Sequence, residues 1–192
     1  MIISIVGLSG SGKSFICNIL KGYNSRIMHV DIDKIGHSTH HDPVVKQQLI
    51  DTFGIEILTN DDIDRQKLGK IVFCSKQAMS KLEDITWSFM EQQIDNIIAN
   101  NRDKIILLDW LLLPRTKFFY SSDLRILITA PLDVRMQRAM KRDNITEEKF
   151  LQRESSAPLI DESKFEYIIN NISLNETQER VKNIYDKSFI HR

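Results

Sequence analysis

One short segment constrains this chain more than any other. Residues 7–14 read Gly-Leu-Ser-Gly-Ser-Gly-Lys-Ser, which matches the pattern G-x-x-x-x-G-K-[ST] at every fixed position. The apolar residues 2–6 precede this segment, and a helical pattern begins near residue 13. In such a loop the glycines let successive backbone N–H groups converge on phosphate oxygens, and the dipole of the following helix adds to the attraction. The segment therefore predicts a phosphate-binding loop between a strand and a helix.

The predicted nucleotide contacts are the loop residues and their neighbour. They are Ser9, Gly10, Ser11, Gly12, Lys13, Ser14 and Phe15. We expect Lys13 to reach the β- and γ-phosphates as a catalytic charge, and the Ser14 hydroxyl to bind Mg²⁺. The expected cofactors are therefore ATP and Mg²⁺.

Apolar, strand-like runs alternate with helical patterns along the rest of the chain. We expect strands at residues 2–6, 27–30, 105–108, 124–129 and 167–169. Helices are expected at residues 13–23, 75–100 and 175–187, and others begin at Asp42-Pro43, near Asp64 and at Pro131. This alternation predicts an α/β fold with a doubly wound, parallel, five-stranded sheet flanked by helices. The length suits a single domain over residues 1–192.

Composition argues against two classes of partner. Lys plus Arg and Asp plus Glu both number 26, so the net charge of zero suggests neither a nucleic acid nor a charged membrane surface. No apolar stretch approaches the roughly 20 residues that span a bilayer, and residues 2–6 predict a strand rather than a signal peptide. We expect Cys17 and Cys74 to be buried thiols of a reducing compartment, and the protein to be cytoplasmic.

Phosphate-binding loops of this kind occur in GTPases, motor ATPases and small kinases. The sequence contains no N-K-x-D motif, with which a GTPase reads its base, and 192 residues are too few for the separate working domains of a motor ATPase. A small-molecule kinase is the class that these observations favour. Such an enzyme deprotonates a hydroxyl group, aligns it with the γ-phosphate and neutralises the group in transfer.

Three aspartates follow expected strands, at the sheet edge where ligands bind in this architecture. Asp31 and Asp33 would face the same side if the segment is extended. Asp33 is the expected general base, and Asp31 would order Mg²⁺ or the substrate, unless one of them caps a helix. Asp109 ends the third strand as in a Walker B element, where its carboxylate would act on the metal through water beside the substrate. The alternative for Asp109 is a turn residue.

Arginines supply the positive charge that phosphoryl transfer needs. Arg135, Arg138 and Arg142 have the spacing i, i+3, i+7, so they share one face of the helix that Pro131 opens. Guanidinium groups suit phosphate oxygens, so a lid helix would bring Arg138 to the nucleotide and Arg142 to the transferring group. A solvated basic face is the alternative. Arg65 is a further candidate for a phosphate clamp on the substrate.

These residues belong to a longer pattern that resembles the dephospho-coenzyme A kinase family. Besides the loop, the pattern includes the segments at residues 31–36, 53–54, 63–68, 72–73, 82–85, 137–143 and 167–171. The resemblance implies transfer of the γ-phosphate of ATP to the ribose 3′-hydroxyl of dephospho-coenzyme A. It also implies a helical substrate-binding region at about residues 60–100 and a lid at about residues 135–157. Asp33 would be the base, Arg65 a substrate contact and Arg142 a lid arginine on the phosphates.

The chain departs from this family's pattern on the acceptor side and in the lid. Trp87-Ser88 replaces a His-Pro pair, Pro114 stands where the family has a glutamate, and a lid glutamine near Ala157 is absent. Two alternatives therefore stay open. One is a kinase of another nucleoside or nucleotide, and the other is a nucleotide-binding module without catalysis. We expect a monomer or a small homo-oligomer.

Overall fold

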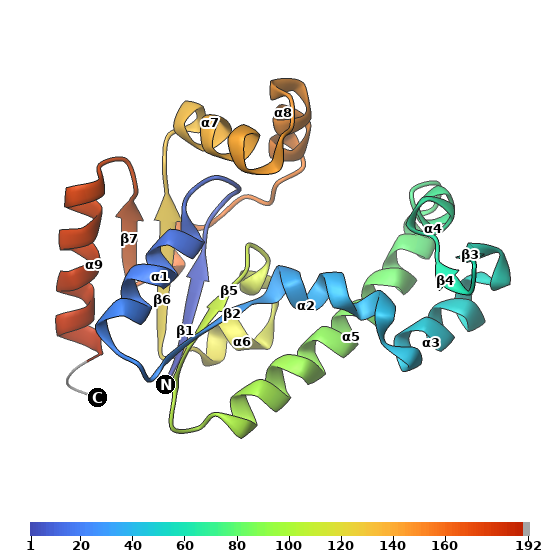
Figure 1. Ribbon diagram of the computed structural model, residues 1–192, viewed down its shortest axis with the longest axis horizontal. Helices are drawn as coiled ribbons and strands as arrows, with labels where there is room; N and C mark the ends of the chain where they lie inside the picture. The colour runs from blue at the N-terminus through green and yellow to red at the C-terminus, as the bar shows by residue number, and fades with distance from the viewer. Residues whose placement is uncertain (190–192) are drawn as a thin grey trace. The chain divides into compact units, whose positions relative to one another are not determined.

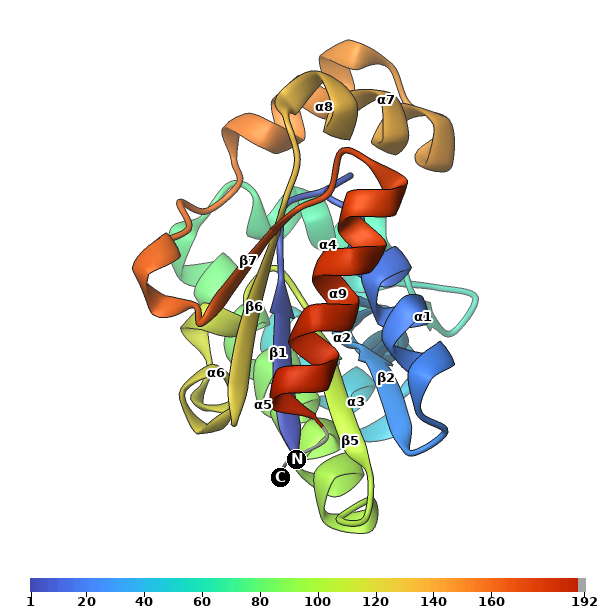
Figure 2. The same ribbon diagram turned by 90° about the vertical axis from the view of Figure 1, so that its left-hand side faces the viewer.

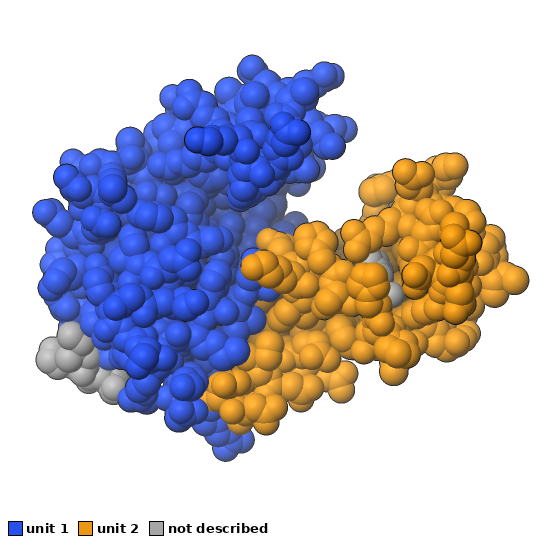
Figure 3. Space-filling view, in the orientation of Figure 1, with its two compact units in different colours: residues 1–31, 102–192 blue, residues 32–101 orange. Residues whose placement is uncertain are grey.

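The computed structural model describes residues 1–189, apart from the side chain of His40, and the chain divides into two compact units. Unit 1 combines Met1–Asp31 with Arg102–Arg192, and unit 2 is the intervening Ile32–Asn101 (Figure 3). Residues 190–192 of the predicted single domain lie outside the described part. That domain, with its helical region from about residue 60, stays a prediction; the unit that holds these helices begins earlier, at Ile32.

Unit 1 is built on a five-stranded parallel sheet in the order β2-β5-β1-β6-β7 (Figure 1). The strands are β1 (Ile2–Val6), β2 (Ile27–Asp31), β5 (Ile105–Asp109), β6 (Leu124–Thr129) and β7 (Tyr167–Asn170). β1 is central, and Ile3, Ile5 and Val6 are fully buried, as expected of a β-branched strand covered on both faces. The predicted parallel sheet is confirmed, and β2, β5 and β7 each extend one residue further than predicted.

Helices cover both the faces and the carboxyl edge of this sheet. They are α1 (Lys13–Tyr23), α6 (Lys117–Ser121), α7 (Leu132–Asp143), α8 (Glu147–Ser155) and α9 (Leu174–Ser188), with short 3₁₀ turns at Leu113–Arg115 and Glu162–Lys164. α1 and α9 lie side by side on one face (Figure 2), where Ile16, Leu20 and Val181 join the core of the sheet. α7 and α8 lie beyond the carboxyl ends of the strands (Figure 1). The helix predicted at Pro131 is therefore α7.

Unit 2 is mainly helical. Its elements are α2 (Ile32–Ser38), a 3₁₀ turn at Thr39–His41, α3 (Pro43–Phe53), a 3₁₀ turn at Ile55–Ile57, β3 (Leu58–Thr59), β4 (Asp62–Ile63), α4 (Arg65–Val72) and α5 (Lys76–Asn100). Asp42, Asp64 and Ser75 each accept backbone N–H groups at the start of α3, α4 and α5, which explains where these helices begin. The antiparallel β3–β4 hairpin was not predicted. No helix in the described part of the chain is long and apolar enough to cross a membrane.

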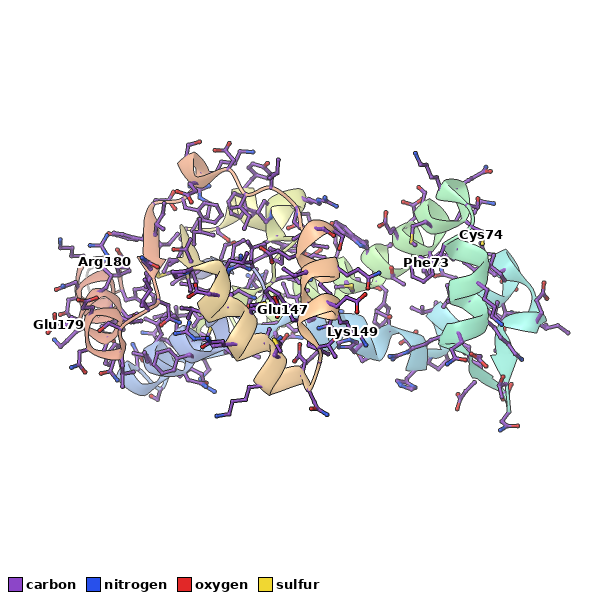
Figure 4. All side chains as sticks on the ribbon, turned by 90° about the horizontal axis from the view of Figure 1, so that it is seen from above. Phe73, Cys74, Glu147, Lys149, Glu179 and Arg180 are labelled. Atoms are coloured by element: carbon purple, nitrogen blue, oxygen red, sulfur yellow. The ribbon has the colours of Figure 1, made fainter. Side chains whose placement is uncertain are left out.

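Two expectations about individual residues are wrong. Cys74 is exposed rather than buried, because it lies in the short link between α4 and α5 (Figure 4). The segment after β2 is not extended, because α2 begins at Ile32, directly after Asp31. Asp33 therefore lies in the first turn of a helix, where it is exposed while Ile32 is buried. The alternation that was to place both aspartates on one side does not hold.

Candidate nucleotide-binding site

The loop at residues 7–14 links β1 to α1 and has no room for side chains at its glycines. Gly10 and Gly12 have φ angles of +79° and +96°, which residues with a Cβ rarely adopt. A Cβ at Gly10 would lie 2.1 Å from the carbonyl oxygen of Arg135, and one at Gly12 would lie 2.1 Å from the amide nitrogen of Asn171. Among the described residues no side chain caps the start of α1, so its first N–H groups are available to an anion.

Next to the loop, Lys13 and Ser14 face the buried carboxylate of Asp109. Lys13 Nζ lies 3.9 Å from Asp109 Oδ1 and donates a hydrogen bond of 3.0 Å to the carbonyl of Gly7. The Ser14 hydroxyl donates to Asp109 Oδ2 over 3.5 Å. Asp109 is only 3% exposed, yet among the described residues its Oδ1 has no hydrogen-bond partner. A buried carboxylate oxygen that accepts no hydrogen bond from the described residues and lies beside a lysine and a serine fits a role toward a bound cation or its water shell.

Sequence reasoning missed His29, which also contacts Asp109. His29 Nε2 lies 3.0 Å from Asp109 Oδ2. The contact forms because β2 and β5 are parallel neighbours, in which His29 lies opposite Leu107 and Asp31 lies opposite Asp109, two residues further along each strand. Nothing near His29 in the sequence signals this contact. It depends on which strands are neighbours.

Asn171 is a second residue whose position was missed, although it lies in the segment at residues 167–171 that carried the family resemblance. Its side-chain amide donates to the carbonyl of Ser11 over 2.8 Å, and its Oδ1 accepts from the Thr177 hydroxyl over 3.3 Å. Asn171 is 4% exposed. These contacts tie the phosphate-binding loop to the end of β7 and the start of α9.

The predicted arginines of α7 take different partners. Arg138 donates to the carbonyl of Asn171 over 2.9 Å, and Arg142 Nη2 lies 3.3 Å from the Ser9 hydroxyl, so both reach the neighbourhood of the loop. Arg142 also donates to Asp143, and this hydrogen bond holds the pKa of the Asp143 carboxyl below its ordinary value.

Arg135 shares a helical face with Arg138 and Arg142, but it is buried and binds a carboxylate of the neighbouring helix. It is 7% exposed, and its guanidinium donates to both carboxylate oxygens of Glu154 on α8, at 2.8 and 2.5 Å. It also donates to the carbonyls of Ala130 and Ser9. Arg135 therefore fastens α8 to α7 and α7 to the loop.

The other predicted site residues lie in both units. In unit 1, Asp31 is paired with Asp109 across β2 and β5, and Phe15 is 39% exposed on α1. In unit 2, Asp33 lies on α2, and Arg65 at the start of α4 donates to the carbonyl of His37 over 3.4 Å. That Asp33 and Arg65 act in the same site as the phosphate-binding loop stays a prediction.

A glycine-rich phosphate-binding loop on a five-stranded parallel sheet, with arginine-bearing helices at its carboxyl edge, defines a P-loop kinase. The family model of dephospho-CoA kinase matches residues 1–178. The chain therefore belongs to the dephospho-CoA kinase family, which makes it a phosphotransferase with an alcohol acceptor, a small-molecule substrate and ATP as the donor.

Relatives agree with the family, and solved structures agree with the fold. The chain is 32% identical to the dephospho-CoA kinase of Aquifex aeolicus over 96% of each chain, and 32% identical to that of Carboxydothermus hydrogenoformans over 97% of this chain and 95% of the relative. Among solved structures, TT1252 from Thermus thermophilus superposes with a TM-score of 0.81 at 23% identity, covering 97% of both chains. Shikimate kinase from Bacteroides thetaiotaomicron shares the fold, with a TM-score of 0.53 at 10% identity over 97% and 96% of the two chains.

Proposed function

We propose that this protein transfers the γ-phosphate of ATP to the ribose 3′-hydroxyl of dephospho-coenzyme A, which yields coenzyme A. Family membership supports the reaction. The observation that carries it in the structure is the arrangement of Lys13, Ser14 and the buried Asp109 around the phosphate-binding loop.

The residues present fit a magnesium ion. Ser14 would ligate it through its hydroxyl, and Asp109 would act on it through water, which would donate the hydrogen bond that Oδ1 lacks among the described residues. When bound with nucleotide, Mg²⁺ neutralises charge on the phosphates. Lys13 and Arg142 would stabilise the transferring phosphoryl group, and Ser9, Gly10, Ser11, Gly12, Phe15 and Arg138 would hold the nucleotide.

The remaining proposed roles concern the acceptor. Asp33 would take the proton of the acceptor hydroxyl, Asp31 would help to order the substrate, and Arg65 would bind its phosphate. Helices at about residues 60–100 would form the substrate-binding region, and residues of about 135–157, which fold as α7 and α8, would form the lid. We further propose a cytoplasmic location and a monomer or small homo-oligomer.

The test is a coupled kinase assay with dephospho-coenzyme A, adenosine and common nucleosides as acceptors. We expect turnover with dephospho-coenzyme A. Turnover with another acceptor alone would overturn the proposed substrate.

The base assignment is tested by Asp33→Asn. Loss of a general base lowers kcat by at least about 100-fold, and the dissociation constant for ATP should stay nearly unchanged. Lys13→Ala is the contrasting variant, and should weaken both nucleotide binding and turnover. An Asp33→Asn enzyme with near-normal kcat would show that another group takes the proton.

A further inference from the structure

Three potential metal ligands gather beside the phosphate-binding loop, each from a different element of unit 1. They are Cys17 on α1, His29 on β2 and Asp109 on β5, and one ligand atom of each lies within 4.8 Å of the other two. Cys17 is fully buried, Asp109 is 3% exposed, and the side chain of His29 is 14% exposed. The phosphate-binding pattern at residues 7–14 requires neither a thiol nor an imidazole at these positions.

The chemistry of this cluster differs from that of a magnesium site. A thiolate, an imidazole and a carboxylate together suit Zn²⁺ or Co²⁺, whereas Mg²⁺ prefers oxygen ligands throughout. Zinc binds nitrogen, oxygen and sulfur at about 2.0–2.3 Å, so its ligand atoms lie roughly 3.3–3.8 Å apart. Donor atoms at the 4.8 Å limit would need to close by about 1.0–1.5 Å, whereas His29 Nε2 and Asp109 Oδ2, 3.0 Å apart, already lie near that spacing.

One oxygen of this cluster could still accept a hydrogen bond or bind a metal. Asp109 Oδ1 is buried without a hydrogen-bond partner in the described part of the chain, although Oδ2 is 3.0 Å from His29 Nε2. A metal bound at His29 Nε2 would take the place of the proton in that hydrogen bond. Burial, and then the charge of Asp109, raise the pKa of the Cys17 thiol well above its ordinary value, so in the metal-free protein the sulfur is protonated.

We propose that Cys17, His29 and Asp109 form a binding site for a borderline-soft divalent ion such as Zn²⁺ or Co²⁺. On binding, the metal–sulfur bond forms and the thiol proton leaves to solvent. Bound metal draws Asp109 away from Lys13 and Ser14, and so inhibits phosphoryl transfer. This last consequence rests on the proposed function, whereas the binding itself does not.

Cobalt titration tests the site directly, because a thiolate bound to Co²⁺ gives a charge-transfer absorption in the near ultraviolet. Chelator-stripped protein is titrated with Co²⁺ alone. The chain contains two cysteines, and the exposed Cys74 lies in unit 2 (Figure 4), so it supplies the matched control. We expect the absorption in the wild type and in Cys74→Ser, and its loss in Cys17→Ser and Cys17→Ala. Absorption that follows Cys74, or no absorption in the wild type, overturns the proposal.

Two histidine variants, one for the site and one as its control, give a second test that leaves the fully buried residues unchanged. His29→Gln should weaken Co²⁺ binding at least about tenfold, a loss typical even of groups that only support a metal ligand. The exposed His41 is the control, and His41→Gln should bind Co²⁺ like the wild type. Equal affinities in both variants would remove His29 from the site. Circular dichroism and ATP binding confirm that each variant is folded.

The inhibitory consequence is measured separately. With saturating Mg²⁺ and ATP, added Zn²⁺ should lower turnover in the wild type and in Cys74→Ser at concentrations that match the binding titration. If no acceptor supports turnover at all, the proposed function fails while the cobalt result stands. If Zn²⁺ binds without inhibition, the withdrawal of Asp109 is refuted.

Discussion

At the scale of single residues, Asn171 holds the phosphate-binding loop in shape. Its buried amide is shared between Ser11 and Thr177, and its nitrogen occupies the space that a Cβ at Gly12 would need. Asn171→Ala should cost about 1–3 kcal/mol of unfolding free energy, since it leaves buried polar groups unpaired. ATP binding should weaken about tenfold, or about 1.4 kcal/mol. Urea unfolding and calorimetric ATP titration measure the two effects.

The adjacent Asn170 provides the comparison for that experiment. It is exposed at the end of β7, so Asn170→Ala should change neither stability nor ATP affinity appreciably. Similar losses in both variants would mean that the strand end, rather than the amide of Asn171, positions the loop.

The sequence predicts residue roles well where one short segment contains all the information. The loop, Lys13 and Ser14 are such a case, because strand, loop and helix follow one another. The contacts of His29 and Asn171 could not be predicted, because each depends on pairing between strands far apart in the chain. Arg135 shows the same limit, since its helical face is shared with Arg138 but its buried partner Glu154 is not visible from spacing.

At the scale of elements, the Arg135–Glu154 pair connects α7 and α8. Glu154→Ala leaves the buried guanidinium of Arg135 without its carboxylate partner, and should cost about 2 kcal/mol of unfolding free energy. The substitution should also accelerate amide hydrogen exchange in α8 more than in α9, because α8 loses its ion pair with α7. Urea unfolding and residue-resolved exchange check both expectations.

Lys149 lies exposed on the same helix (Figure 4) and provides a matched control. Lys149→Ala should stay within about 0.5 kcal/mol of the wild type, as exposed substitutions usually do. Unchanged exchange in α8 of the Glu154→Ala protein would show that other contacts hold the two helices together.

Helices and strands were predicted best where the residue types of a segment and its hydrophobic periodicity indicate the same structure. The β-branched runs of β1 and β6, the N-cap of α3 and the start of α4 near Asp64 are local signals, and the structure has them where the sequence indicated. α2 was misjudged, since Asp31-Ile-Asp33 alternates like a strand but its Ile32 already begins a helix. The two-residue strands β3 and β4 are too short to show any period.

At the scale of the whole molecule, the proposed roles assign Arg65 and the phosphate-binding loop to different units, so we expect nucleotide and acceptor recognition to be altered separately. Arg65 lies in unit 2, whereas the phosphate-binding loop lies in unit 1. Arg65→Ala should raise the KM for dephospho-coenzyme A about tenfold, by loss of a charged contact, and leave ATP affinity unchanged. Steady-state kinetics with each substrate varied in turn measures this. Lys70→Ala, an exposed change on the same helix, is the control; equal effects on both substrates would refute the separation.

The discontinuity of unit 1 also determines when this protein can become functional during its own synthesis. β1 has β5 and β6 as neighbours, and the Ser11 carbonyl is held by Asn171, 160 residues further along the chain. Unit 2 is contiguous, so it can fold while the loop still lacks its surroundings. At typical translation rates this interval lasts on the order of 10 s. During that time the phosphate-binding loop lacks its contact with Asn171, which can form only after β7 has been synthesised.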